Sequence, residues 1–259
     1  MSLQIQYLLF AFAAGAAMGS FANVLIHRLP AGRSIVSPGS RCPACDKAIR
    51  WYDNVPIVSY LLLRGRCRSC GGTISPRYPV VELITGLLFA GVLWRMGLQA
   101  GTAIIALFLW ALVVVTFIDL DHRIIPDVIS LPGIVVGLAF SLLPGSPRPL
   151  DSLLGAAIGA GFLFFVLVAY EKIMGDEGMG MGDVKLMAMI GAFLGWQALP
   201  VTILVSSLTG TLVGICYAVV KGEPVRKFPV PFGPFLALGA VVHIFFGLEM
   251  ILWYLEKLS

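Results

Sequence analysis

The chain has 259 residues, of which 58% are hydrophobic and only 12% are charged, with a formal net charge of +4. Roughly a quarter of the residues of an ordinary soluble domain are charged, so the composition excludes that class. Apolar stretches recur that approach the roughly 20 residues a helix needs to cross a bilayer. A membrane protein with several spanning helices is therefore predicted.

Eight apolar stretches are candidates for these helices. In chain order they lie near residues 5–26, 79–95, 100–118, 128–144, 152–170, 184–198, 200–220 and 232–255. A cleavable signal would have basic residues before the first stretch, and none is present, so we expect residues 1–26 to remain as the first transmembrane helix. The second, fourth and sixth stretches are short for a full crossing. The predicted fold class is an all-α polytopic membrane protein with about eight transmembrane helices.

The positions of the basic residues predict the orientation of these helices. With the start of the chain outside, segments 27–78, 119–127, 171–185 and 221–227 lie inside and hold 15 of the 18 Lys and Arg residues. Lys and Arg accumulate on the cytosolic side, so both chain ends are expected outside. The basic residues then lie beside anionic lipid head groups, and no nucleic acid partner is predicted.

The insert at 27–78 contains two Cys-x-x-Cys pairs, Cys42 with Cys45 and Cys67 with Cys70. Two residues between cysteines let both sulfur atoms of one tight turn face a single ion, and two such turns supply four thiolates to Zn²⁺. The sequence around the pairs repeats with a period of 25 residues. Each copy is therefore expected to form half of a zinc site.

Two disulfides are the alternative, and an oxidising compartment would favour them. The predicted cytosolic location argues against disulfides, because the cytosol keeps thiols reduced. Arg41, Arg66 and Arg68 stand next to the cysteines, where their charge would favour ionised sulfur. Because protein ligands fill all four positions, the predicted zinc is structural.

Two aspartates are flanked by apolar sequence. Asp119 follows the third stretch, and Asp183 opens the sixth in the motif Gly180-Met181-Gly182-Asp183. A charged side chain in the middle of a membrane helix costs at least about 2.5 kcal/mol, so these residues need a reason to be there. The glycines at 180 and 182 would let a neighbouring backbone or an extended substrate come close.

Two carboxyl groups brought within a few ångströms cannot both ionise easily, so one holds a proton while the other is charged. The charged group can take a proton from water during attack on an amide carbon, and the protonated group can hydrogen-bond the carbonyl oxygen. Solvated charges or helix caps are the alternative reading. That reading is favoured for Asp121, Asp127 and Asp176, with Asp127 expected to be the N-cap of the fourth span.

Two other classes of function fit the intramembrane carboxylates. An ion-coupled or proton-coupled transporter would use them to relay protons or bind cations. A non-catalytic assembly protein would tolerate their loss. The residues alone leave these classes open beside a peptidase.

The sequence resembles the prepilin peptidase family, a group of intramembrane aspartic proteases with a Gly-x-Gly-Asp motif. The resemblance covers nearly the whole chain. It rests on Gly19-Ser20-Phe21-Ala22-Asn23-Val24, His27-Arg28-Leu29-Pro30, the cysteine pairs with Trp51-Tyr52-Asp53-Asn54, Arg77-Tyr78-Pro79 and both aspartate motifs. The family pattern places its first catalytic aspartate seven residues before a Pro-Asp pair, which selects Asp119, and its second is Asp183.

The resemblance implies that the protein removes the short basic leader of type IV prepilins or type II secretion pseudopilins. Cleavage would follow a glycine on the cytosolic side of the bacterial inner membrane. It also implies N-methylation of the new terminus, with S-adenosylmethionine as donor. The expected division is a first transmembrane helix at 1–26, a zinc-binding domain at 27–78 and a peptidase domain at 79–259.

Charge suggests where a basic leader binds. The basic insert would repel it, whereas the aspartate motifs gather acidic side chains near the same face. We therefore expect the acidic residues, with Asp176 and Glu177 among them, to receive the leader.

Overall fold

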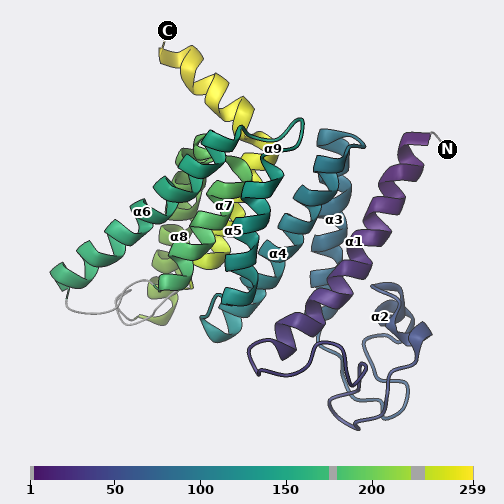
Figure 1. Cartoon of the computed structure of the whole chain (residues 1–259). Coiled ribbons are helices and arrows are strands. Elements are labelled where there is room, and N and C mark those ends of the chain that lie inside the picture. The colour runs from purple at the N-terminus through teal and green to yellow at the C-terminus, as the bar shows by residue number, and fades with distance from the viewer. Residues whose placement is uncertain (1–2, 175–179, 223–230, 259) are drawn as a thin grey trace. The chain divides into compact units, whose positions relative to one another are not determined.

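The structure is a computed structural model that describes residues 3–174, 180–222 and 231–258. Over these residues its regular structure is helical, apart from two isolated β-bridges. The elements, shown in Figure 1, are α1 (Leu3–Arg28), η1 (Trp51–Asn54), α2 (Val58–Leu62), α3 (Arg77–Met96), α4 (Ala100–His122), α5 (Asp127–Phe140), α6 (Pro149–Met174), α7 (Met181–Leu194), η2 (Trp196–Ala198), α8 (Leu199–Lys221) and α9 (Gly233–Leu258).

Every predicted span corresponds to one of these helices. Six of the described helices, α1, α3, α4, α6, α8 and α9, are long and apolar enough to cross a membrane. Helices α5 and α7 have 14 residues each and rise about 21 Å, less than a hydrocarbon core of about 30 Å. The prediction of an all-α polytopic membrane protein is confirmed, and the count of eight spans stays a prediction.

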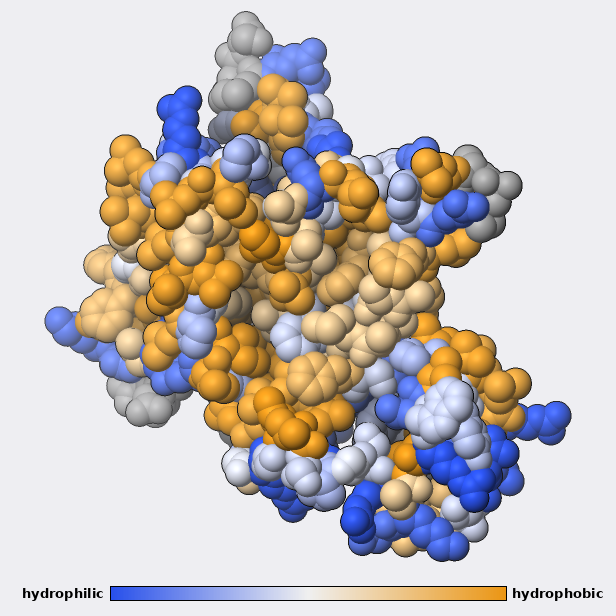
Figure 2. All heavy atoms as spheres, turned by 45° about the vertical axis from the view of Figure 1, so that its right-hand side comes forward, coloured by the Kyte–Doolittle hydropathy of each residue, from blue (hydrophilic) through white to orange (hydrophobic). Residues whose placement is uncertain are grey.

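Apolar side chains cover much of the face that Figure 2 shows. The chain divides into two compact units, Met1–Val114 and Val115–Ser259. Helix α4 contributes its larger part to the first unit and its end to the second. The expected division into segments 1–26, 27–78 and 79–259 stays a prediction.

In the first unit, α1 and α3 pack closely because α1 presents glycines four residues apart. A β-carbon at Gly19 would lie 2.6 Å from the α-carbon of Glu82, and one at Gly15 would lie 2.7 Å from the carbonyl oxygen of Thr85. Small residues at this spacing let membrane helices approach backbone to backbone. The side-chain amide of Asn23 adds a hydrogen bond to the carbonyl oxygen of Tyr78, at 3.1 Å.

In the second unit, α7 is a buried helix that packs against α5, α6 and α9. Ten of its 14 residues are buried, so neighbouring helices rather than lipid surround most of it. Glycines on the neighbours make room: a β-carbon at Gly137 of α5 would lie 2.8 Å from the Phe193 ring, and Gly155 of α6 lies against the backbone of Gly191. A helix enclosed by protein need not be long enough to span the bilayer.

Candidate functional site

The four cysteines of the insert form one cluster in the first unit. Their sulfur atoms all lie within 4.8 Å of one another, and the Cys42 and Cys70 sulfur atoms are 3.9 Å apart. Four sulfur atoms at about 2.3 Å from a tetrahedral zinc ion are about 3.8 Å from each other, whereas a disulfide bond is about 2.05 Å long. All four cysteines are free thiols, so the cluster could hold a metal ion and does not form two disulfides.

The repeat of 25 residues recurs in the backbone hydrogen bonds of the insert. The amide of Cys42 donates to the carbonyl oxygen of Lys47 at 3.0 Å, and the amide of Cys67 donates to that of Gly72 at 2.8 Å. Each cysteine turn is closed by a short bridge, Arg41 with Ala48 and Arg66 with Thr73. The two copies thus bring their sulfur atoms into one cluster that could hold a metal ion, and zinc as that metal stays a prediction.

The electrostatics of the cysteine turns depend on backbone amides and on ion pairs. The backbone N–H groups of Cys70 and Ser69 lower the pKa of the Cys67 thiol to about 6, which favours thiolate at neutral pH. Arg41 pairs with Asp46 at 3.0 Å, and Arg68 with Asp53, as described next. These two arginines are therefore paired with carboxylates.

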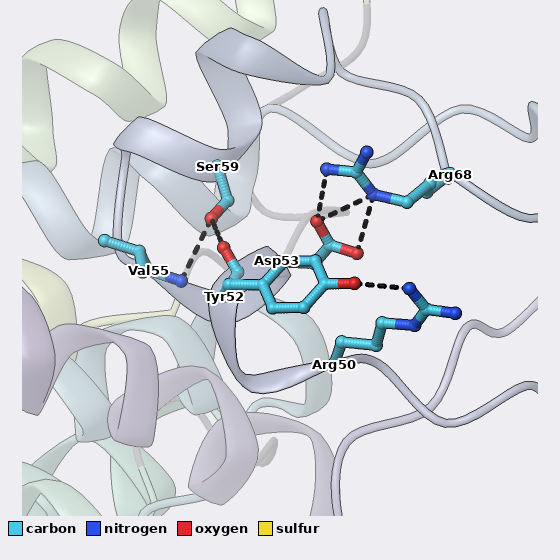
Figure 3. Close-up of polar contacts among 6 residues, drawn as sticks. All are labelled: Arg50, Tyr52, Asp53, Val55, Ser59 and Arg68. Carbon is cyan, nitrogen blue, oxygen red and sulfur yellow. Dashed lines mark hydrogen bonds and ion pairs between the residues drawn. The ribbon is translucent and has the colours of Figure 1, made fainter.

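Arg68 also connects the second cysteine turn to η1. Its guanidinium donates to both carboxylate oxygens of Asp53, with the shortest contact at 2.7 Å (Figure 3). This contact lowers the pKa of Asp53. Arg50, the residue before η1, donates to the hydroxyl of Tyr52 (Figure 3). The second cysteine turn and η1 are thus held together by charge-assisted hydrogen bonds.

Asp119 lies in the last turn of α4, where its side chain is 5% exposed. Its Oδ2 accepts a hydrogen bond of 3.0 Å from the backbone amide of Gly233, the first residue of α9. The start of a helix carries unpaired amides and a partial positive charge, which stabilise an anion. A side chain at 233 would collide with the carboxylate, since a β-carbon there would lie 2.7 Å from Oδ2.

Asp183 lies in the first turn of α7 and is 8% exposed. Its Oδ1 is buried without a hydrogen-bond partner among the described residues. The charge of Asp119 acts on Asp183, so the structure brings the two predicted aspartates within electrostatic range of each other. A carboxyl group buried beside a second carboxyl group is arranged to carry a proton.

Ile125, in the loop between α4 and α5, joins the two halves of this site. A β-carbon at Gly182 would lie 2.9 Å from the β-carbon of Ile125, and one at Gly233 would lie 3.3 Å from its Cδ1. Close approach at Gly182 was expected, and a side chain rather than a backbone makes it. Among the described residues, an added β-carbon at Gly180 would meet only the Gly182 nitrogen, at the ordinary distance of 3.8 Å.

Asp127 has a different role from the one expected. It is the first residue of α5, whose N-cap is Pro126 without a side-chain hydrogen bond, so the prediction of an Asp127 N-cap is wrong. Its carboxylate instead pairs with Lys185 of α7 at 2.7 Å, because the start of α5 lies beside the first turn of α7. Asp176 and Glu177, predicted to receive a basic leader, lie outside the described residues.

Sequence reasoning missed three contributors to the site, Gly233, Ile125 and Lys185. The amide of Gly233 has no side-chain signature, and it lies 114 residues from Asp119. The ion pair of Lys185 could have been predicted, since a lysine two residues after a buried aspartate requires a counter-ion or solvent.

The fold and the site together define a polytopic membrane protein with two buried aspartates at helix ends and a four-cysteine insert. Residues 13–96 match the family model described as the bacterial peptidase A24 N-terminal domain, and residues 106–215 match that of the type IV leader peptidase family. The chain belongs to the type IV leader peptidase family.

Curated relatives cover almost the whole chain. The prepilin leader peptidase/N-methyltransferase of Aeromonas hydrophila is 40% identical, with 93% of this chain and 91% of the relative aligned. Proteins of the same name from Stutzerimonas stutzeri and Pseudomonas aeruginosa are each 38% identical, covering 97% and 93% of this chain and 95% and 91% of the relatives. No solved structure matches the chain.

Proposed function

We propose that this protein is a prepilin leader peptidase in which Asp119 and Asp183 are the catalytic residues. The observation that carries the proposal is the arrangement of these two buried carboxyl groups. One is held by the amide at the start of α9, and the other has an oxygen without a partner among the described residues. The names of the relatives support prepilins as the substrate class.

The different surroundings of the two aspartates support different roles. Because the Gly233 amide donates to Asp119, Asp119 is the ionised group and the general base. The Oδ1 of Asp183 is buried without a donor among the described residues, and Asp183 is therefore the protonated group and the general acid. A carboxylate that accepts backbone hydrogen bonds favours its charged form, and burial favours the neutral form.

Hydrolysis then follows in two steps, each with two proton transfers. Asp119 takes a proton from water as the water oxygen bonds to the peptide carbon, and Asp183 gives its proton to the carbonyl oxygen. The tetrahedral intermediate collapses when its C–N bond breaks. The nitrogen then receives the proton held on Asp119, and a hydroxyl of the intermediate returns a proton to Asp183. Both residues recover their starting states, and general acid and base catalysis of this kind contributes about 10²- to 10⁴-fold.

The location and the substrate follow from charge. Because 15 of 18 basic residues fall in the segments assigned to the inside, we place the cysteine insert and the aspartates on the cytosolic side of the bacterial inner membrane. The leader of a prepilin or pseudopilin is short and basic, and the acidic residues around Asp119 and Asp183 suit it.

The second activity in the relatives' names, N-methylation, is proposed here as well. It requires a methyl donor, and S-adenosylmethionine is the donor we propose. For the cysteine cluster we propose Zn²⁺ bound by Cys42, Cys45, Cys67 and Cys70, because sulfur separations near 3.9 Å suit a tetrahedral zinc site. Zinc would stabilise the insert and take no part in hydrolysis, since its four positions are filled.

Cleavage of a purified prepilin by the protein in detergent tests the proposal. Asp119→Asn and Asp183→Asn should each lower the cleavage rate by at least about 100-fold, because each removes one proton-transfer group. Asp121→Asn is the matched control, since it removes a nearby exposed carboxylate, and it should keep its kcat. Full activity of either Asn variant at 119 or 183 would reject the catalytic assignment. A transporter or an assembly protein would show no cleavage at all.

A further inference from the structure

Helix α2 of the insert exposes an entirely apolar face. Val58, Leu61 and Leu62 are 50%, 68% and 77% exposed, and their spacing places them on one side of a helix. Three large apolar side chains together on a short helix are unfavourable in water. In Figure 2 the lobe at the lower right, which is the insert, carries apolar side chains directly beside strongly hydrophilic ones.

The orientation of α2 is fixed from its opposite face. The buried Ser59 accepts a hydrogen bond from the Val55 amide at 3.0 Å and donates to the Tyr52 carbonyl oxygen at 2.9 Å (Figure 3). These contacts tie α2 to η1, which Arg68 in turn ties to the second cysteine turn. The apolar face therefore cannot turn inward without breaking this polar network.

The depth of α2 is set by a contact with a membrane-spanning helix. The backbone amide of Ile57, the residue before α2, donates to Oε2 of Glu82 at 2.7 Å. Glu82 is buried five residues beyond the start of α3, which is about 7.5 Å along the helix axis. Ile57 has φ of 61° and ψ of −51°, which is unusual for a β-branched residue and marks a tight turn between the Pro56 carbonyl oxygen and the Val58 amide.

The length of α3 restricts how deep in the membrane the start of α2 can lie. Its 20 residues rise about 30 Å, close to the thickness of the hydrocarbon core. The start of α3 must therefore lie near the head groups. The side chain of Glu82 is directed back toward the helix start. The amide that it binds therefore lies at the level of the membrane interface. Helix α2 begins one residue after that amide.

The charged residues around α2 indicate which kind of surface its apolar face contacts. Exposed Arg64 and Arg66 follow directly after the helix, and the insert as a whole carries nine Lys and Arg against two Asp. Trp51 in the adjacent η1 is 83% exposed, and tryptophan is enriched at membrane interfaces. Apolar side chains combined with flanking arginines match the acyl and head-group layers of an anionic bilayer.

We propose that α2 is an interfacial anchor that seats the metal-binding insert on the membrane. Val58, Leu61 and Leu62 enter the boundary between head groups and acyl chains, and Arg64 and Arg66 contact anionic head groups. The insert is then held at three points, by α1, by α3 and by the lipid itself. The anchor is independent of the peptide chemistry, so its test does not depend on the assignment of the catalytic aspartates.

A fluorescent amino acid in place of Leu62 tests the anchor in the full chain, reconstituted in nanodiscs that contain phosphatidylglycerol. The expected result is blue-shifted emission that is lost when the lipids carry bromine on their acyl chains. The same probe in place of Lys47, exposed on the first cysteine turn, should emit as in water and be quenched by aqueous iodide. Water-like emission at 62 without quenching by brominated lipid would overturn the proposal.

Two further measurements test the role of the arginines and distinguish lipid binding from peptide binding. Arg64→Gln with Arg66→Gln should reduce the lipid quenching at 62, and prepilin cleavage in the same sample shows that the variant is folded. An unchanged signal would refute the role of the arginines. A probe at 62 that responds to added prepilin and not to brominated lipid would identify α2 as a peptide-binding surface, which also rejects the anchor.

Discussion

The contact between Gly182 and Ile125 gives a sharp test of the site's geometry. Gly182→Ala places a methyl group 2.9 Å from the β-carbon of Ile125 and 3.4 Å from its Cγ1, whereas carbon atoms in contact are about 3.5–4.0 Å apart. Ile125 and the first turn of α7 must then separate by about 0.5–1 Å. Overpacking of this size costs about 1–3 kcal/mol, and a displacement near 1 Å at a reacting group can lower a rate about 10²-fold.

Prepilin cleavage and thermal unfolding, measured on the same preparations, check this prediction. Gly182→Ala should lower kcat/KM by about 10- to 100-fold. Gly180→Ala is the matched control from the same motif. Its rate should stay within about twofold, because the one described atom near its β position is the Gly182 nitrogen, at 3.8 Å. Ile125→Ala should partly rescue Gly182→Ala, since the contact between β-carbons remains. Equal losses at 180 and 182 would refute the steric reasoning.

The remaining predictions concern other contacts of the described residues. Gly233→Ala should abolish most peptidase activity, because its methyl group would lie 2.7 Å from Asp119 Oδ2; a normal rate would remove the amide of α9 from the mechanism. Asp127→Asn should change kcat less than tenfold, since its partly exposed pair with Lys185 contributes about 1 kcal/mol or less, and a larger loss in steady-state kinetics would assign the pair a positioning role. Gly71→Ala should destabilise the insert by about 1 kcal/mol because Gly71 has φ of 71°, seen as faster release of zinc to a chelator. Asp46→Gly at the equivalent position, with φ of 54°, should slow that release or leave it unchanged.

Local patterns in the sequence predicted the helices and the cysteine turns because both depend on short-range spacing. Apolar stretches of suitable length give helices wherever lipid or protein surrounds them, and two Cys-x-x-Cys turns bring their sulfur atoms together. The two copies of the repeat also fold alike, with matching backbone hydrogen bonds at Cys42 and Cys67. These features need no knowledge of how distant helices pack.

The burial of α7 could not be predicted from the sequence. Lipid tails and apolar side chains present the same chemistry to a helix, so a helix enclosed by α5, α6 and α9 has the composition of one that faces the bilayer. The prediction for Asp127 was wrong for a related reason, since its partner Lys185 is 58 residues away in the sequence. The Gly233 amide that holds Asp119 is a main-chain group, and every residue except proline offers one.

The enclosure of α7 also ties the chemistry of Asp183 to the interior of the helix bundle. Gly191, which lies against Gly155, is eight residues beyond Asp183 on the same straight helix, about 12 Å away. A larger residue at Gly191 or Gly155 would shift or tilt α7, and the Asp183 side chain in its first turn would move with it. Variants selected only for tighter packing of the helices should therefore alter the rate of hydrolysis as well, because α7 contributes both to the packing and to the active site.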